Sequence, residues 1–252
     1  MENIILEVCA FNIQSCIIAE QVGAVRAELC DNPTEGGTTP SYGAIRQTRE
    51  KISIQLYPII RPRAGDYLYD DNEFAIIRKD IEICKQLGCD GISVGIQKQN
   101  GEIDIDRLKQ IVQWAYPMGV TCNRVFDRTP DPFKSLEDII SCGCERILTS
   151  GQKSAAPDAT EILSRLVTQA DERIIIMPGA GVKSTNIEKL IRETGAREFH
   201  TSARKIAESV SHQNPDILDT GNVYIAEESE LRKILSIANG VRSQESGVRS
   251  QE

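Results

Sequence analysis

The chain has 252 residues, of which 40% are hydrophobic, and a formal net charge of −8 at pH 7. This hydrophobic content is enough to build a sizeable core, which excludes wholesale disorder. The negative charge argues against a cationic surface for nucleic acid, and no apolar run approaches the roughly 20 residues that a membrane-spanning helix needs.

Short apolar segments alternate with amphipathic segments along most of the chain. The apolar segments predict strands over residues 4–9, 25–30, 53–60, 91–95, 120–126, 146–149, 173–177 and 198–202. The amphipathic segments predict helices over 13–22, 41–51, 72–87, 104–116, 131–141, 160–169, 184–192 and 227–238. Many of these helices begin at Ser, Asp or Pro and end near Gly, which is the expected capping pattern.

Eight strand–helix repeats predict an α/β fold, a single-domain (β/α)8 barrel (TIM barrel) over residues 1–239. A doubly wound open sheet is the main alternative, because counting elements does not exclude it. The segment 240–252 is polar and contains the hexapeptide Gly-Val-Arg-Ser-Gln-Glu twice, on either side of Ser246. We therefore expect a disordered tail there.

Eight cysteines are spread along the chain, and no two of them have the Cys-x-x-Cys spacing of zinc sites. The opening Met1-Glu2-Asn3-Ile4 lacks the cationic start of a signal peptide, so we expect a cytoplasmic protein whose thiols stay reduced. Most of these thiols are then expected to be small buried hydrophobic groups.

The first two predicted strands end alike, in Glu7-Val8-Cys9 and Glu28-Leu29-Cys30. Because side chains alternate along a strand, the glutamate and cysteine of each strand share the inward face. Adjacent strands lie about 4.8 Å apart, so Cys9 and Cys30 could hold one soft cation, and thiolates select Cu(I). The alternative is that both cysteines fill the barrel while Glu7 and Glu28 bind something else.

Arginines follow the third and fifth predicted strands. Arg61 and Arg63 flank a proline ahead of Asp66, and Arg124 lies in the fifth strand. Guanidinium groups at the barrel mouth suit a phosphate or carboxylate ligand. A ring of salt bridges with barrel carboxylates and no ligand is the alternative.

The last three predicted strands end in small and polar residues. Ser150 follows the sixth strand, Gly179 and Gly181 follow the seventh, and His200 lies in the eighth. Barrels often bind phosphate with the loops after strands seven and eight, so these residues join the candidate anion site. His200 is a candidate general acid–base or metal ligand.

These motifs, in this order, resemble the CutC family of copper homeostasis proteins. The matching segments are Leu6-Glu7-Val8-Cys9, Glu28-Leu29-Cys30, Glu35 to Ser41, Ile60-Arg61-Pro62-Arg63, Gly65 to Tyr69, Arg124 to Asp127, Leu148 to Gln152, Ile176-Met177-Pro178-Gly179 and Phe199-His200. The resemblance covers about residues 4–204 and implies a cytoplasmic, oligomeric (β/α)8 barrel associated with copper tolerance. It also places the family's proposed Cu(I) ligands at Cys9 and Cys30.

Two positions depart from the family pattern. The family usually has His-Arg-Ala-Phe-Asp on strand five, whereas this chain has Asn123, which neither takes nor gives a proton near neutral pH. The family's Met-Pro-Gly-Gly-Gly has Ala180 in place of its middle glycine. A catalytic activity of relatives would therefore transfer to this chain less safely than the fold.

Three functions remain open from the sequence. The first is a copper homeostasis protein that binds Cu(I), and the second is a metabolic enzyme for a small phosphorylated or carboxylated substrate. The third is a scaffold without a small-molecule ligand. The acid–base candidates of the enzyme would be Glu7, Glu28, Asp66 and His200, with the anion held by Arg61, Arg63 and Arg124. We expect no nucleic-acid or membrane partner and, from the resemblance, a homo-oligomer.

Overall fold

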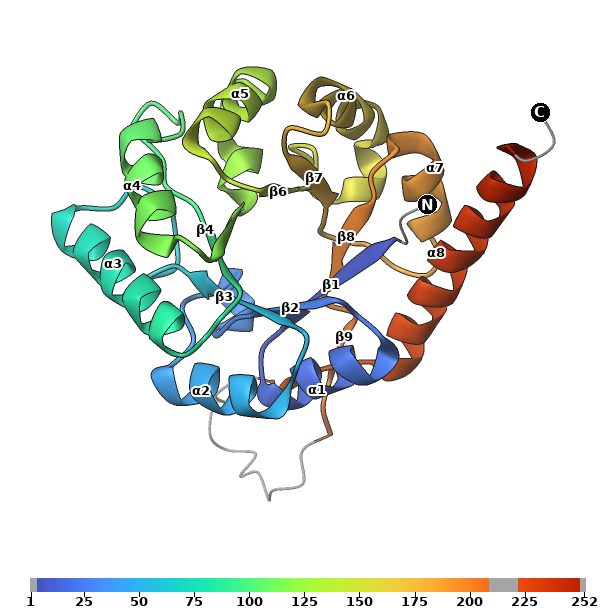
Figure 1. The fold of residues 1–252 in the computed structure, drawn as a ribbon, viewed down its shortest axis with the longest axis horizontal. Coiled ribbons are helices and arrows are strands. Elements are labelled where there is room, and N and C mark those ends of the chain that lie inside the picture. Colours follow the sequence, from blue (N-terminus) through green and yellow to red (C-terminus); the bar gives the residue numbers. More distant parts are fainter. Residues whose placement is uncertain (1–3, 209–221, 250–252) are drawn as a thin grey trace, which may run out of the picture.

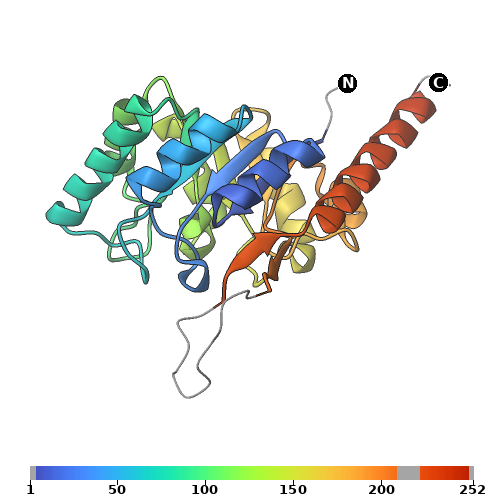
Figure 2. The same cartoon turned by 90° about the horizontal axis from the view of Figure 1, so that it is seen from below.

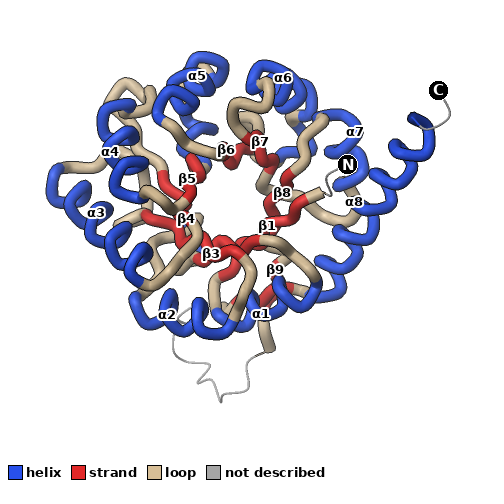
Figure 3. Tube along the Cα trace, viewed as in Figure 1, coloured by secondary structure: helices blue, strands red, loops and turns tan. Residues whose placement is uncertain are grey.

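Eight parallel strands form a nearly closed barrel with helices around it (Figures 1 and 3). This computed structural model describes residues 4–208 and 222–249, with side chains in the last helix as far as Val241. The barrel strands are β1 (Ile5–Ala10), β2 (Arg26–Leu29), β3 (Gln55–Ile60), β4 (Gly91–Val94), β5 (Gly119–Cys122), β6 (Arg146–Thr149), β7 (Ile175–Pro178) and β8 (Glu198–Thr201). Their order, β7-β6-β5-β4-β3-β2-β1-β8, confirms the barrel and excludes the doubly wound sheet.

One helix follows each strand on the outside of the barrel. The helices are α1 (Ile13–Val22), α2 (Tyr42–Lys51), α3 (Asp71–Gln86), α4 (Ile105–Ala115), α5 (Pro132–Cys142), α6 (Thr160–Ala170), α7 (Ile187–Thr194) and α8 (Glu228–Arg249). The predicted caps explain several boundaries. The Asp70 side chain accepts from the backbone N–H of Glu73, and the Glu73 side chain accepts from that of Asp70, which is a complete capping box for α3.

Several elements differ from the sequence prediction. Strand five ends at Cys122, because the Asn123 side chain accepts the backbone N–H of Val125 and begins a short 3-10 helix, Arg124–Arg128. Helix α7 begins at Ile187 instead of residue 184, because the Ser184 backbone and hydroxyl both bind Glu230 of α8. A short antiparallel ribbon of β9 (Arg204–Ile206) and β10 (Tyr224–Ala226) was not predicted.

The expected disordered tail is helical through Arg249, where α8 extends away from the barrel (Figure 2). Ile234, Ala238 and Val241 are all buried against the barrel side of α8, so the apolar helical spacing continues past Gly240. Residues 250–252 of the expected tail lie outside the described residues.

The apolar core lies between the strands and the helices, as in other barrels of this class. One cluster packs under α2 to α5, and a second joins β1 and β8 to α7 and α8. Inside the barrel itself the side chains are largely polar: Glu7, Arg26, Arg146 and Glu198 are all buried there. The strand positions thus direct apolar residues outward and charged residues inward.

Candidate functional site at the barrel mouth

A cavity of about 640 Å³ opens at the carboxyl ends of the barrel strands. Its lining includes Cys9 from β1, Glu28 from β2, Asn123 after β5 and His200 from β8. In this fold the carboxyl ends of the strands carry the functional groups, so this cavity is the candidate site.

The two cysteines singled out in the sequence face each other. The Sγ atoms of Cys9 and Cys30 lie 3.8 Å apart, and the Cys30 thiol lies 3.5 Å from Oε2 of Glu28. The Cys9 and Cys30 sulfurs and a Glu28 oxygen all lie within 4.8 Å of one another. Among the described residues this is the group whose donor atoms could hold a metal ion.

His200 connects this group to Glu7. The two residues are partners in the β1–β8 register, and Nδ1 of His200 lies 2.7 Å from Oε1 of Glu7. Nε2 of His200 lies 3.8 Å from Oε2 of Glu28, on the cysteine side of the ring. The imidazole is therefore held by one glutamate while its other nitrogen faces the cavity group.

The thiols differ in protonation. The hydrogen bond from Cys30, together with those from His200 and Glu28, outweighs burial and lowers the pKa of Cys9 to about 5. The same hydrogen bond to Cys9, with burial, raises the pKa of Cys30 well above its usual value. The lowered pKa of Cys9 favours its thiolate at neutral pH, beside a Cys30 that keeps its proton.

The pKa values of Glu28 and Glu7 are shifted in opposite directions. Burial, followed by the charge of the Cys9 thiolate, raises the pKa of Glu28 to about 8. Burial alone would raise the pKa of Glu7, but the Arg26 charge and the His200 hydrogen bond lower it to about 2. Burial disfavours the charged form of His200, yet hydrogen bonds to Cys9 and Glu7 raise its pKa well above the usual value. At pH 7 the raised pKa favours the neutral form of Glu28, beside an ionised Glu7 and an imidazolium.

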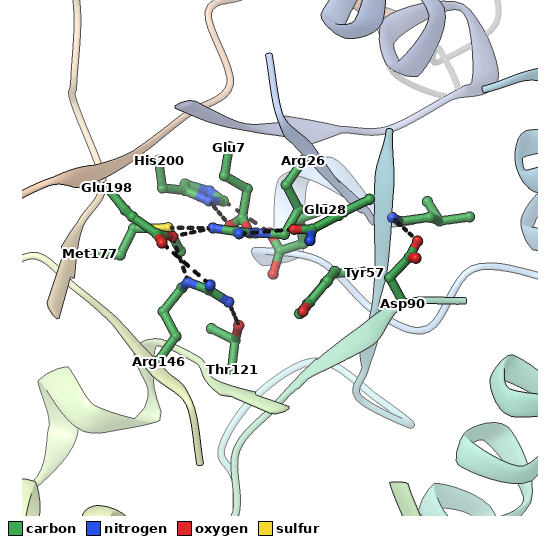
Figure 4. Close-up of polar contacts among 12 residues, drawn as sticks. Glu7, Arg26, Glu28, Tyr57, Asp90, Thr121, Arg146, Met177, Glu198 and His200 are labelled. Carbon is green, nitrogen blue, oxygen red and sulfur yellow. Dashed lines mark hydrogen bonds and ion pairs between the residues drawn. The ribbon is translucent and has the colours of Figure 1, made fainter. Parts of the chain in front are cut away.

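A buried lattice of ion pairs lies behind Glu7 inside the barrel (Figure 4). Arg26 binds Glu7 through Nε and reaches Oε2 of Glu198 at 2.5 Å through Nη2. Arg146 binds the same Glu198 oxygen at 2.7 Å, and both guanidinium groups lie over the Tyr57 ring. This lattice fixes Glu7, and through it the orientation of His200.

The arginines after strand three have partners within the chain. The Arg61 guanidinium donates to the backbone carbonyls of Glu35, Gly37 and Gly65. Arg63 pairs with Glu73 and with Asp66, which are both on the outer side of this loop. None of Arg61, Arg63 and Asp66 lines the cavity described above, and Arg61 borders a smaller hollow beside it.

Arg124 and Ser150 meet at the other side of the mouth. Arg124 donates to Asp127 at 2.8 Å through Nε and to the Ser150 hydroxyl at 2.9 Å through Nη2. Asp127 also accepts from the backbone N–H groups of Ser150 and Gln152, so it organises the loop after β6. Arg124 lines the cavity with its side chain 42% exposed.

The glycines after β7 have different surroundings. A Cβ on Gly179 would lie 2.4 Å from Cδ1 of Leu148, so this position needs glycine for packing. Gly181 lines the cavity at a φ of +76°, which glycine adopts without strain. Ala180 between them has a φ of +68° in the same left-handed region.

Sequence reasoning missed the lattice of Arg26, Arg146 and Glu198. Charged residues inside otherwise apolar strands were the available signal, because a barrel interior must pair them. It also missed Arg128 and Lys153 beside Arg124, since exposed cations in loops look like ordinary surface residues.

Within the described residues, no helix is long and apolar enough to span a membrane. All eight cysteines are free thiols, and seven of them are buried, as the sequence predicted for most.

The comparisons with known proteins agree with this geometry. A model of the CutC family matches residues 4–205. The chain is 48% identical over 200 residues to a CutC family protein from Chromobacterium violaceum, covering 79% of this chain and 81% of that protein. It is 46% identical over 227 residues to a CutC family protein from Parabacteroides distasonis, covering 90% and 93%.

The fold agrees as well. The structure matches the crystal structure of CutC from Streptococcus agalactiae, a protein named for copper homeostasis, with a TM-score of 0.75 and 33% identity. That match covers 79% of this chain and 98% of the other. A phosphoribosylanthranilate isomerase from Thermotoga maritima matches with a TM-score of 0.60 at 9% identity, which shows the barrel fold alone. Taken together, the sequence matches and the shared barrel show that this chain belongs to the CutC family.

Proposed function

We propose that this protein binds Cu(I) between Cys9 and Cys30 and serves copper homeostasis. The observation that carries the proposal is the distance of 3.8 Å between the sulfurs of Cys9, which lines the mouth cavity, and Cys30, which follows the neighbouring strand β2. The name of the family supports the same metal.

The chemistry of the donors favours Cu(I) over harder cations. Thiolates are the ligands that select Cu(I), whereas Mg²⁺ and Ca²⁺ prefer several carboxylate oxygens. Cys9 is already a thiolate at neutral pH, and Cys30 must release one proton to become the second ligand. Glu28 is protonated at neutral pH and is a hard donor, so it contributes little to binding a soft ion.

An anaerobic titration of the reduced protein with Cu(I), against a competing chelator, tests the proposal. We expect one Cu(I) per chain, and loss of that binding in the Cys9→Ser/Cys30→Ser double variant. Cys142→Ser is the matched control, because Cys142 is a buried free thiol on α5, whose sulfur lies 3.7 Å from the Ile105 carbonyl. Binding that survives in the double variant, or is lost in the control, contradicts the assignment.

A second candidate function is an enzyme acting on a small phosphorylated or carboxylated substrate. The arrangement that favours it is the line of Glu7, His200 and Cys9, in which an acid orients an imidazole beside a thiolate. Nucleophilic catalysis uses this order of groups. Turnover of phosphorylated or carboxylated metabolites by metal-free protein, lost in Cys9→Ser and in His200→Gln, would establish it. Turnover that both variants retain contradicts it.

We also propose a cytoplasmic location and a homo-oligomeric state. The eight free thiols support the location, since a reducing compartment keeps them unpaired. Cell fractionation tests the location. Light scattering of the purified chain tests the assembly, and a mass equal to one chain, 27.9 kDa, contradicts it.

A further inference from the structure

A second recess adjoins the mouth cavity and is lined by cations. Its volume is about 380 Å³, and Arg124, Arg128 and Lys153 all border it. Tyr67 and Arg124 line both the recess and the mouth cavity, so the two spaces are neighbours. We call the part lined by Arg124, Arg128 and Lys153 the cationic recess.

Two of the three cations of the recess, Arg128 and Lys153, have no ion-pair partner among the described residues, whereas Arg124 pairs with Asp127. Arg128 and Lys153 are exposed, and neither makes a hydrogen bond or ion pair through its side chain within residues 4–208 and 222–249. The Arg128 guanidinium carbon lies 5.3 Å from the centroid of the Tyr67 ring, and the Arg128 charge also acts on Asp66. Arg124 uses Nε and Nη2 for Asp127 and Ser150, which leaves Nη1 open within the described chain.

This cluster is unusual for a chain with a net charge of −8. Elsewhere on the surface, arginines pair with glutamates, as in Arg46–Glu50, Arg78–Glu82 and Arg173–Glu137. The two carboxylates at the recess do not balance its cations. Asp127 is bound by Arg124 and by the loop after β6, and Glu35 is the remaining acid. The excess of cations around this recess, with Arg128 and Lys153 outside any ion pair of the described residues, favours an anionic occupant.

An unpaired polar group in the mouth cavity points to the same kind of ligand. Asn123 is 3% exposed, and its Nδ2 has no hydrogen-bond partner among the described residues. Its Oδ1 accepts the Val125 backbone N–H at 3.0 Å, which fixes which end of the amide is which. A buried donor without a partner costs about 1–3 kcal/mol, and a ligand oxygen would remove that cost.

The other walls of the mouth cavity leave room for the organic part of a small ligand between the cationic recess and Asn123. Ile59, Leu148 and Tyr67 contribute apolar surface to the cavity beside Asn123. Pockets for metabolites combine such apolar walls with a few convergent polar groups.

We propose that the barrel mouth binds a small phosphomonoester, with its phosphate in the cationic recess and an oxygen of its organic part on Nδ2 of Asn123. Three cations suit a dianionic phosphate better than a single carboxylate, and arginine can bind phosphate with two parallel hydrogen bonds. The site is separate from the thiol pair, because none of its donors comes from Cys9 or Cys30. It therefore stands or falls independently of copper binding.

The test is calorimetric titration of the full, metal-free chain with glycerol 3-phosphate, inorganic phosphate, glycerol and citrate. We expect binding of glycerol 3-phosphate and weaker binding of inorganic phosphate, with none of glycerol. In the Arg128→Gln/Lys153→Gln variant the affinity for glycerol 3-phosphate should fall by about tenfold or more, which corresponds to about 1.4 kcal/mol. Both positions are exposed, so the variant keeps the fold, which circular dichroism checks.

The matched control is Lys51→Gln/Lys109→Gln, which removes two exposed cations from α2 and α4, away from the recess. This control should bind glycerol 3-phosphate as the unaltered chain does. Three results would overturn the proposal: no binding of either phosphate, binding of citrate in place of phosphate, or equal losses in the two double variants.

Discussion

At the scale of single residues, Arg26 is the centre of the barrel interior. It is 1% exposed and holds Glu7 and Glu198 together, while Glu7 in turn holds His200. A buried ion pair adds little net stability when it forms, because both charges lose their hydration. Removing one partner is different, since the charge left behind is buried without compensation.

We therefore expect Arg26→Leu to lower the free energy of unfolding by about 3–5 kcal/mol. Arg46→Leu is the control, because Arg46 makes an exposed pair with Glu50 and should cost about 0.5 kcal/mol or less. Urea denaturation followed by circular dichroism measures both. Similar losses in the two variants would mean that the lattice is not the source of the effect.

Ala180 departs from the family pattern, and its backbone conformation is one that is strained for alanine. Its φ of +68° lies in the left-handed region, where a Cβ meets the neighbouring carbonyl oxygen. Glycine adopts this conformation freely. We expect Ala180→Gly to raise the free energy of unfolding by up to about 1 kcal/mol in urea denaturation. Ala115→Gly, which replaces a completely buried alanine of α4, should lower it. A loss at both positions would contradict the strain argument.

At the scale of elements, apolar spacing and capping residues predicted the barrel strands and their helices closely. The predicted fifth strand is too long, because Val125 and Phe126 continue an apolar run in the sequence. In the structure the Asn123 cap begins a 3-10 helix there. The predicted start of helix α7 is too early, because Ser184 has the residue type of a helix cap but binds Glu230, 46 residues away. Local patterns carry no information on such a distant partner.

The candidate site shows the same division. Alternation along β1 and β2 was enough to bring Cys9 and Cys30 to one face, and the resemblance pointed to the same pair. The sequence does not predict which guanidinium group is available to a ligand. Arg61 is bound by three backbone carbonyls, and only the folded loops bring these carbonyls near it. Arg128, which the sequence did not single out, borders the recess with a guanidinium that has no ion pair within the described residues.

Helix α8 gives the prediction that belongs to this scale. Ile234 is completely buried in the cluster that joins α8 to β1 and β8. We expect Ile234→Ala to lower the free energy of unfolding by about 2–5 kcal/mol, through lost contacts and a cavity. Lys233→Ala, one residue earlier on the exposed face, should change it by about 0.5 kcal/mol or less. Equal values in urea denaturation would show that α8 does not pack as a structural part of the barrel.

At the scale of the whole molecule, the barrel is closed by side chains where its backbone ladder ends. The ladder order ends in β7 and β8, and no hydrogen-bonded pairing joins these two strands within the described residues. Glu198 of β8 crosses this seam by binding Arg146 of β6, and it also binds Arg26 of β2 on the other side of β1. The same lattice orients His200 at the mouth, so closure of the barrel and the state of the site depend on shared charges.

The titratable groups at the barrel mouth make the free energy of unfolding depend on pH in opposing ways. The pKa of Cys9 is lowered from 9.0 to about 5, so between these values the folded chain has lost a proton that the unfolded chain keeps, and stability rises with pH. The pKa of Glu28 is raised from 4.5 to about 8, so the folded chain keeps a proton there and stability falls with pH. The raised pKa of His200 adds a second falling contribution above its ordinary value of 6.5.

Between pH 5 and 6.5 the contributions of Cys9 and Glu28 have opposite signs, so they offset one another in the free energy of unfolding of the unaltered chain. Glu28→Gln removes the falling contribution, and its stability should rise by up to about 1.4 kcal/mol per pH unit in that window. Glu35→Gln, an exposed carboxyl at the mouth, should keep the profile of the unaltered chain. Urea denaturation at several pH values measures all three. Parallel profiles for Glu28→Gln and the unaltered chain would mean that the Glu28 carboxyl is already ionised in this range, and that the cavity does not hold it neutral beside the Cys9 thiolate.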